Sequence, residues 1–366
     1  MKQVVFITGN LNQPRVIKRI ESFYDRGYQI KVYGFDRGTF QNVNVLNESI
    51  EVVKWGDIEN GKNYLSSFKF NKEKILPVIK EYKENSGVVF YVFGFIPALI
   101  FYLYSNSKYI YEISDLIYGY FKSSFVRKIF KIIDKRIINK SELTVLTSQG
   151  FYQYFYNSNI KENVLVQPNK VSESLRNIDS NDDLIKNDSI RFSFIGFLRY
   201  PKTVFGFAEI IGEMYQNYSF HFYGDSEYRE QAAELSEKYK NVFFHGKFKN
   251  PDDLQIIYNN VDVIVACYDT STFNERVAEP NKLYESIFFN KPIIVSDDTF
   301  LAQKVEGLGC GYCIDASTKE NILKFINSID IENINMKKTI IKQIPKESVI
   351  DRPEDIIDFL ENGTWV

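Results

Sequence analysis

The sequence predicts an α/β protein of two doubly wound, Rossmann-like domains. Short apolar runs alternate with amphipathic segments along most of the 366 residues, which is the pattern of parallel strands joined by crossover helices. A polar stretch over 171–189 interrupts this alternation, with Asn, Asp and Ser clustered together. The hydrophobic fraction of 44% is sufficient for two separate cores. We therefore expect a first domain over 1–170, a linker over 171–189 and a second domain over 190–348.

The first half predicts alternating strands and helices, beginning with a βαβ unit. Gly94 and Pro97 divide the long apolar run 88–104, so a buried strand and a short helix are expected there rather than a membrane span. Apolar runs predict strands over 4–8, 29–34, 52–54, 88–93, 109–113, 143–147 and 164–167, and helical periodicity predicts helices over 15–25, 72–84, 97–104, 121–139 and 149–156.

The second half repeats the alternation. Its expected strands are 191–196, 221–223, 242–245, 261–266 and 292–295, and its expected helices are 204–215, 228–238, 252–258 and 282–289. A last helix is expected over 353–361, because Pro353 suits a helix start and Gly363 a helix end. Ligands of such sheets bind at the carboxyl ends of the strands.

The segment 279–296 carries the strongest functional signal: a polar loop, a helix and a buried strand. Asn281 and Lys282 fall at the positive end of the helix, where free N–H groups can bind the diphosphate of a nucleotide. Glu285 lies one turn further along, and its carboxylate could accept both hydroxyls of a ribose. The alternative is an ordinary helix start with Pro280 near the first turn.

In its Pro-Asn-Lys-x-x-Glu form, this segment resembles the donor-nucleotide motif of GT-B-fold glycosyltransferases that make bacterial polysaccharides. The resemblance implies two domains facing a central cleft, with a C-terminal helix in 349–366 that packs back on the first domain. It implies a UDP- or GDP-sugar as donor and a glycan or polyprenyl-linked acceptor. No cofactor and no metal are expected. Donor contacts are expected from Glu279, Asn281, Lys282, Leu283 and Glu285.

The predicted strand 191–196 ends in Gly196 and is followed by Arg199 and Lys202. A departing diphosphate builds negative charge, and fixed cations stabilise that charge most in the transition state. The segment resembles the family's glycine, arginine and lysine loop, although Phe197 stands where many members have arginine. Arg199 is the expected replacement. The alternative is a solvated surface pair.

Other strand ends could contribute to the same site. Gly224 and Lys247 follow two further strands of the second half, at positions that the family uses for the phosphate and base pockets. In the first half, Gly9 and Asn10 end the first strand and could bring backbone donors to the cleft. Strands ending in glycine are common in doubly wound sheets, so a structural role is the alternative for Gly224 and Lys247.

Asp115 and Glu112 are the acids expected on the acceptor side. The segment 111–118 resembles the family's catalytic segment, but the histidine that often precedes the acid is missing. If the reaction inverts configuration, Asp115, or else Glu112, could deprotonate the acceptor hydroxyl, whereas in a retaining reaction it would only position it. The alternative for Asp115 is a helix cap.

The stereochemical outcome stays open. Many retaining members have two glutamates separated by seven residues, and here the position that precedes Glu285 at this spacing is Val277. Glu275 and Glu279 lie close to it. Either could reach the hydroxyls of the donor sugar.

The helix predicted over 121–139 is basic and amphipathic, with one broad side of Phe and Ile and another of Arg and Lys. Such a helix could lie on an anionic membrane, which suits a polyprenyl-linked acceptor. The alternative is a core-facing helix with a solvated basic side.

Composition excludes several classes. Lys and Arg total 45 against 47 Asp and Glu, so binding of nucleic acid through bulk charge is not expected. Three cysteines and the lack of a signal peptide favour the cytoplasm, at the inner face of the membrane if the basic helix binds there. Cys310 and Cys313 are expected in a strand and turn rather than in a metal or redox site, and both histidines, His221 and His245, fall in predicted strands.

Two other functions stay open. A nucleotide-sugar epimerase on the same scaffold would release free nucleotide without any acceptor. A catalytically silent subunit that binds nucleotide or glycan would fit the missing histidine and the displaced glutamate.

Overall fold

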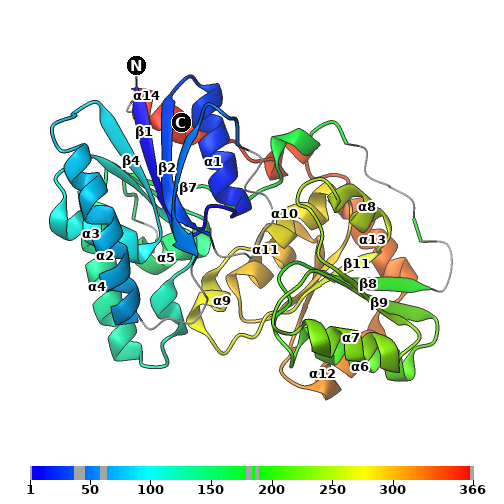
Figure 1. The fold of residues 1–366 in the computed structure, drawn as a ribbon. Coiled ribbons are helices and arrows are strands. Elements are labelled where there is room, and N and C mark those ends of the chain that lie inside the picture. The colour runs from blue at the N-terminus through cyan, green and yellow to red at the C-terminus, as the bar shows by residue number, and fades with distance from the viewer. Residues whose placement is uncertain are drawn as a thin grey trace. The chain divides into compact units, whose positions relative to one another are not determined.

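The structure is a computed structural model, and it describes residues 2–36, 46–57, 64–157, 159–178, 184–185 and 189–362. The chain divides into two compact units. Unit 1 comprises Met1–Pro168 and Arg352–Val366, and unit 2 comprises Asn169–Asp351. Each unit is built on one parallel β-sheet with helices packed against it (Figure 1). The predicted fold class, with two doubly wound α/β domains, is confirmed.

Unit 1 contains a seven-stranded sheet in the order β3-β2-β1-β4-β5-β6-β7, with every neighbouring pair parallel. The strands are β1 (Gln3–Thr8), β2 (Gln29–Asp36), β3 (Glu51–Asp57), β4 (Val88–Phe93), β5 (Tyr109–Ile113), β6 (Leu143–Leu146) and β7 (Val164–Val166). The described helices are α1 (Pro14–Asp25), α2 (Tyr64–Glu81), α3 (Phe95–Tyr104), the 3-10 helix η2 (Ile117–Tyr120), α4 (Ser124–Lys140), α5 (Gln149–Tyr156) and α14 (Glu354–Asn362).

Helices cover both faces of this sheet. In Figure 1, α2, α3 and α4 lie together on one side and α1 on the other. Ile356 and Ile357 of α14 pack in the same core as Val4, Phe6 and Ile20. The last helix therefore returns to the first unit, as predicted.

Unit 2 contains a six-stranded parallel sheet in the order β10-β9-β8-β11-β12-β13. The strands are β8 (Ile190–Ile195), β9 (Tyr218–Tyr223), β10 (Val242–Gly246), β11 (Val263–Ala266), β12 (Ile293–Ser296) and β13 (Gly311–Ile314). The described helices are η3 (Glu173–Leu175), α6 (Val204–Met214), α7 (Arg229–Lys238), α8 (Leu254–Asn259), α9 (Phe273–Val277), α10 (Asn281–Phe288), α11 (Phe300–Leu308), α12 (Lys319–Ser328), α13 (Ile331–Ile341) and η4 (Lys346–Val349).

The central strands of unit 2 are apolar on both faces because each face has its own core. Phe192 and Phe194 of β8 pack with residues of α6 and α12, whereas Ile195 packs with residues of α8 and α10 on the opposite face. Both faces of the sheet are covered by helices, so ligands can reach it only at the ends of its strands. The loops after the strands therefore form the available binding region.

Several boundaries differ from expectation. Helix α2 begins at Tyr64 and contains Pro77. Helix α4 begins at Ser124 rather than residue 121, because the Ser123 hydroxyl caps it by accepting the N–H of Val126 at 3.4 Å. At the start of the expected linker, Val171 pairs with Ile350 and its side chain lies in the unit 2 core. Residues 179–183 and 186–188 of that segment lie outside the described residues.

Asp134 of α4 is a buried acid that should make the stability of the protein depend on pH. It accepts hydrogen bonds from the hydroxyls of Tyr111 and Tyr118, each at 2.9 Å. Burial raises the pKa of Asp134 to about 7, so between pH 4 and 7 the folded state holds a proton that the unfolded state has lost. The free energy of unfolding should therefore fall as pH rises through this window, by up to about 1.4 kcal/mol per pH unit from this group.

We expect Asp134→Asn to remove this contribution. Urea unfolding at pH 5 and pH 7 would measure the difference in stability for both proteins. An equal pH dependence in the wild type and in Asp134→Asn would contradict the assignment to this carboxyl.

Candidate functional site

Three neighbouring strands of unit 2 lead into glycines with positive φ. Gly196 (+138°) follows β8, Gly224 (+141°) follows β9 and Gly246 (+74°) ends β10. The N–H of Gly196 donates to the carbonyl of Tyr223 at 2.8 Å, and that of Gly224 donates to the carbonyl of Gly246 at 2.7 Å. A Cβ on Gly224 would stand only 1.7 Å from the carbonyl oxygen of Gly196. Glycine is therefore required for the close approach of these two strand ends.

The predicted signature helix is present as α10, and Glu285 is buried within it. Its Oε2 accepts hydrogen bonds from the Lys282 ammonium at 2.9 Å and from the Tyr258 hydroxyl at 2.8 Å. Its Oε1 accepts from the Asn281 amide at 2.5 Å. Only 3% of Glu285 and 7% of Lys282 is exposed, so this is a buried ion pair held by further hydrogen bonds.

Lys282 connects the start of α10 with the end of β8. A Cβ built on Gly196 would lie 3.3 Å from Cε and 3.7 Å from Nζ of Lys282, so the ammonium rests against the glycine. The N-cap Pro280 provides no side-chain hydrogen bond to the first turn of α10. The structure thus brings together Gly196, Gly224, Asn281, Lys282 and Glu285, which are five of the predicted donor residues.

Tyr258 of α8 is a member of this cluster that the sequence did not indicate. Its ring is buried and stacks on Phe289, with centroids 4.5 Å apart. Burial, and then the negative charge of Glu285, hold the pKa of Tyr258 well above its usual range, so its hydroxyl remains a donor at neutral pH. Tyr258 lies 27 positions before Glu285, and no motif links the two.

Two other predicted donor residues have different surroundings. The carboxylate of Glu279 is fully buried and is held by the Lys304 ammonium and the Tyr284 hydroxyl. The side chain of Leu283 lies in the core, and its N–H donates to the carbonyl of Pro280 at 3.2 Å. Both residues therefore have structural contacts that account for their positions.

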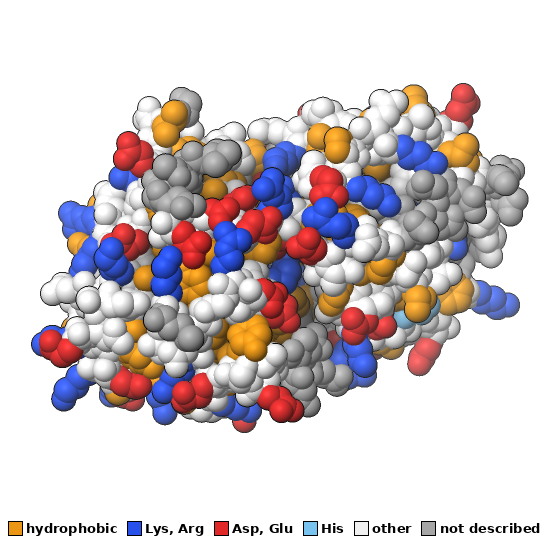
Figure 2. All heavy atoms as spheres, turned by 90° about the horizontal axis from the view of Figure 1, so that it is seen from above, with side chains coloured by type: hydrophobic (Ala, Val, Ile, Leu, Met, Phe, Trp, Pro, Cys, Tyr) orange, Lys and Arg blue, Asp and Glu red, His pale blue; other side chains and the backbone are white. Residues whose placement is uncertain are grey.

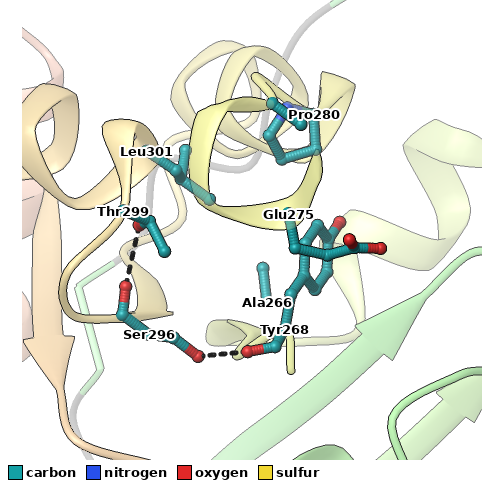
Figure 3. Close-up of a pocket in the computed structure, with 8 residues that line it drawn as sticks. Ala266, Tyr268, Glu275, Pro280, Ser296, Thr299 and Leu301 are labelled. Carbon is teal, nitrogen blue, oxygen red and sulfur yellow. Dashed lines mark hydrogen bonds between the residues drawn. The ribbon is translucent and has the colours of Figure 1, made fainter. Parts of the chain in front are cut away.

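Glu275, the other glutamate near the expected spacing, lines a small hollow at the ends of β11 and β12. Its carboxylate accepts from the hydroxyls of Thr272 and, at 3.3 Å, Tyr200. Figure 3 shows Glu275 beside the ring of Tyr268, with hydrogen bonds from Ser296 to the Tyr268 carbonyl and from Thr299 to the Ser296 carbonyl. The hollow is lined by Ala266, Tyr268, Glu275, Ala278, Pro280, Ser296, Thr299 and Leu301.

The predicted cations of the β8–α6 loop are exposed. The Arg199 guanidinium lies 4.8 Å from the centroid of the Phe197 ring. Lys202 stands in the turn before α6 and, among the described residues, makes no ion pair. Lys247, after β10, lies 3.5 Å from the carboxylate of Asp225. Arg199 and Lys202 are thus on the loop that follows Gly196, and their roles stay predictions.

In unit 1, Gly9 and Asn10 form the turn between β1 and α1. The N–H of Asn10 donates to the Thr8 hydroxyl at 3.1 Å, and its side-chain oxygen accepts from the N–H of Asn12 at 3.2 Å. These bonds fix a compact polar loop at the carboxyl end of β1.

The two acids predicted for the acceptor side differ in exposure. Glu112 of β5 is fully buried, with the Arg19 Nε at 3.3 Å, the Arg15 Nε at 3.8 Å and a close contact to the Tyr91 hydroxyl. These contacts explain why the Glu112 carboxylate is buried, without any role in catalysis. Asp115 is exposed just after β5. It caps neither following helix, because the N-caps of η2 and α4 are Leu116 and Ser123.

The cysteines and histidines lie as expected from the sequence. Cys313 is in β13, Cys310 directly precedes it, and both are free thiols. His221 and His245 lie in β9 and β10. Within the described ranges, no three His, Cys, Asp or Glu side chains form a cluster that could hold a metal ion.

Comparisons with known proteins agree with this geometry. Residues 176–347 match the family described as glycosyl transferases group 1, and this match lies within unit 2. No curated protein sequence matches the chain.

Several solved structures are similar along nearly the whole length. Sucrose-phosphate synthase from Thermosynechococcus elongatus has a TM-score of 0.70 at 11% identity, over 99% of this chain and 98% of the other. HepE from Anabaena, in complex with UDP and glucose, has a TM-score of 0.68 at 14% identity, over 99% and 100%. WaaG, a glycosyltransferase involved in lipopolysaccharide biosynthesis, has a TM-score of 0.66 at 13% identity, over 98% and 100%. At such identities the likeness establishes the fold.

Proposed function

We propose that the chain, whose residues 176–347 match the family described as glycosyl transferases group 1, transfers a sugar from a nucleoside diphosphate sugar to a glycan or lipid-linked glycan of the bacterial surface. The observation that supports this most is the buried Lys282–Glu285 pair at the start of α10, beside Gly196. A carboxylate that can accept hydroxyls, a cation and a helix N-terminus together match the chemistry of a nucleoside diphosphate.

Most of the predicted residues have a role in this mechanism, whereas Glu112 and Leu283 have structural contacts instead. Glu285 accepts the ribose hydroxyls, with Asn281 beside it, and Lys282 and the first turn of α10 bind the diphosphate. Arg199 and Lys202 offset the charge that develops on the departing diphosphate. On the acceptor side, Asp115 orients the attacking hydroxyl, and the loop of Gly9 and Asn10 supplies backbone donors. Gly224 and Lys247 are assigned to the walls of the donor pocket, whereas the fully buried Glu279, paired with Lys304, has a structural role.

A thermal-shift screen with UDP and GDP tests the proposed substrate. A ligand that binds only the folded state raises its melting temperature, by an amount that grows with ligand concentration. Absence of a shift with every nucleoside diphosphate would contradict the proposal. Release of nucleotide from a donor sugar without acceptor would instead indicate an epimerase, and binding without turnover a silent subunit.

We expect Lys202→Ala to lower kcat by a factor of about 100 or more, because removal of one preorganised charge from a developing anion has that effect in other enzymes. The measurement is release of nucleoside diphosphate in the presence of a glycan acceptor. Lys324→Ala, which removes a lysine from α12, is the control. If the two variants have the same kcat, Lys202 has no role in the transition state.

The proposal includes peripheral contact with the inner face of the membrane through α4. Its outward side is apolar: Phe125, Ile129 and Ile132 are 70%, 43% and 55% exposed. Positions 125, 129 and 132 form one stripe of the helix, and the exposed cations Lys128 and Arg136 flank it. This arrangement suits an anionic lipid surface, into which apolar side chains insert while cations meet headgroups.

Part of the basic side that the sequence-based alternative places in solvent packs on a neighbouring helix. The Lys131 ammonium lies 4.0 Å from the centroid of the Tyr154 ring, and the Lys135 ammonium lies 5.0 Å from that of Tyr156, so both pack on α5.

No described helix is both long and apolar enough to cross a bilayer. Figure 2 shows Lys and Arg mixed with Asp and Glu over the face in view, without the continuous basic surface that nucleic acid would require.

Vesicle sedimentation tests this contact. We expect the wild type to bind vesicles that contain anionic lipid, and Phe125→Ser with Ile129→Ser to reduce the bound fraction about ten-fold or more, since each large apolar side chain contributes about 1.5–3 kcal/mol on burial. Ile256→Ser, which alters an exposed apolar residue of α8, is the control. Equal binding by both variants would remove α4 from the proposal.

A further inference from the structure

The Glu285 carboxylate has little remaining capacity to accept hydrogen bonds. A carboxylate offers about four acceptor positions. Among the described residues, Lys282 and Tyr258 donate to Oε2 and Asn281 donates to Oε1. One position on Oε1 is left, whereas the two hydroxyls of a ribose need two. A bidentate ribose contact therefore requires one of the present donors to leave.

Lys282 is the donor with the strongest reason to leave. An ammonium has three donor positions, and in the part of the chain that the structure describes, Glu285 is the one partner of Lys282. Its residue is 7% exposed, so the unused N–H groups are mostly shielded from water. A buried ammonium with unfilled donor positions is costly unless a further acceptor arrives. Its place against Gly196 puts it where the proposed diphosphate binds.

Tyr258 has no such alternative. Its hydroxyl is on a buried ring, fixed by stacking on Phe289 with 15° between the ring planes. A rigid aromatic side chain can keep its bond to Glu285 while a flexible lysine rotates away. The two donors on Oε2 therefore differ in their freedom to move.

We propose that nucleotide binding exchanges the Lys282 ammonium on Glu285 for a ribose hydroxyl, that the released ammonium binds the diphosphate, and that Tyr258 is the positioning residue that holds the carboxylate throughout. This inference rests on the proposed function and couples the binding of the ribose by Glu285 to the binding of the diphosphate by Lys282. The apo site neutralises its own acid, and the phosphate draws the lysine away at the same moment as the ribose needs the carboxylate. Nucleosides without phosphate bind weakly because the lysine has no other anion to accept it.

Calorimetry with paired probes tests the exchange: UDP with uridine, and GDP with guanosine. In Lys282→Met, we expect the affinity for the diphosphate to fall at least about 30-fold, because a charge-assisted contact is lost. The affinity for the matching nucleoside should stay the same or rise, since its hydroxyls no longer compete with the ammonium. If Lys282 were a fixed partner that orients Glu285, both affinities would fall by the same factor, and the exchange would be overturned. Lys282→Gln, which can still donate to Glu285, gives a second variant if Lys282→Met does not fold.

Tyr258→Phe tests the positioning role. We expect it to weaken the diphosphate and the nucleoside by the same factor of about ten, and to raise KM with kcat unchanged. Unchanged affinity for both probes would remove Tyr258 from the proposal. Lys319→Met, which breaks an exposed ion pair with Glu209, is the control and should change neither affinity. Failure of the wild type to bind either diphosphate would overturn the proposed function itself, and this outcome is distinct from equal losses in Lys282→Met.

Discussion

Gly224→Ala is expected to destabilise unit 2 severely and to abolish nucleotide binding. The new Cβ would lie 1.7 Å from the carbonyl oxygen of Gly196 and 2.8 Å from its carbonyl carbon. Both are backbone atoms at the end of β8, and the N–H of Gly196 is already bonded to the carbonyl of Tyr223. No side-chain rotation can relieve such a contact, so β8 and β9 must separate where the diphosphate is expected. A loss of about 4 kcal/mol or more is expected, at the upper end of single substitutions.

Gly246→Ala is the matched control. Gly246 ends the neighbouring strand and also has positive φ, at +74°, but no heavy atom of the described residues would lie within 4 Å of its Cβ. Only backbone strain remains, which costs about 1–2 kcal/mol. Urea unfolding of both variants measures the difference. Similar losses in the two would mean that strain, and not the contact with Gly196, determines the requirement for glycine at position 224.

The sequence could predict the parts of this site that depend on local pattern. The glycine after β8 follows from a buried strand that ends in a permissive residue, and the start of α10 follows from Pro280 and a polar loop before an apolar stripe. Asn281, Lys282 and Glu285 lie within five positions, so their shared face of α10 follows from helix geometry alone. The structure places these three residues beside Gly196. This agrees with their spacing on one helix and with the position of Gly196 at the end of a parallel strand.

Contacts between distant segments could not be predicted in this way. Tyr258 reaches Glu285 from α8, and Lys304 reaches Glu279 from α11. Each pairing depends on how segments far apart in the sequence pack on the same face of the sheet, which residue spacing does not encode. Glu279 and Glu275 lie equally close in sequence to the position that the family spacing indicates. Glu279 is held by Lys304, whereas Glu275 lines a hollow.

The outward side of α4 was also beyond the sequence pattern. A stripe of Phe and Ile ordinarily faces a core, and basic residues ordinarily face water. Here, Lys131 and Lys135 pack on the tyrosines of α5, so part of the apolar stripe turns outward. Periodicity finds the two sides of a helix, but the neighbouring elements decide which side is buried.

Glu285→Ala is expected to have the second large effect, on stability and on binding together. Its removal leaves the Lys282 ammonium buried without its partner, and the loss of one member of a buried ion pair costs about 3–5 kcal/mol. It also removes the acceptor of the ribose hydroxyls. We expect a lower melting temperature and a nucleoside diphosphate affinity reduced about 100-fold or more, measured by thermal unfolding and calorimetry.

The double variant Glu285→Ala with Lys282→Met separates these two effects. Methionine removes the uncompensated charge while keeping an apolar side chain of similar length, so most of the lost stability should return. Affinity for the diphosphate should not return, because neither the carboxylate nor the ammonium is present. Recovery of affinity together with stability would show that Glu285 acts only by keeping unit 2 folded, and the ribose contact would then have to be sought on another side chain.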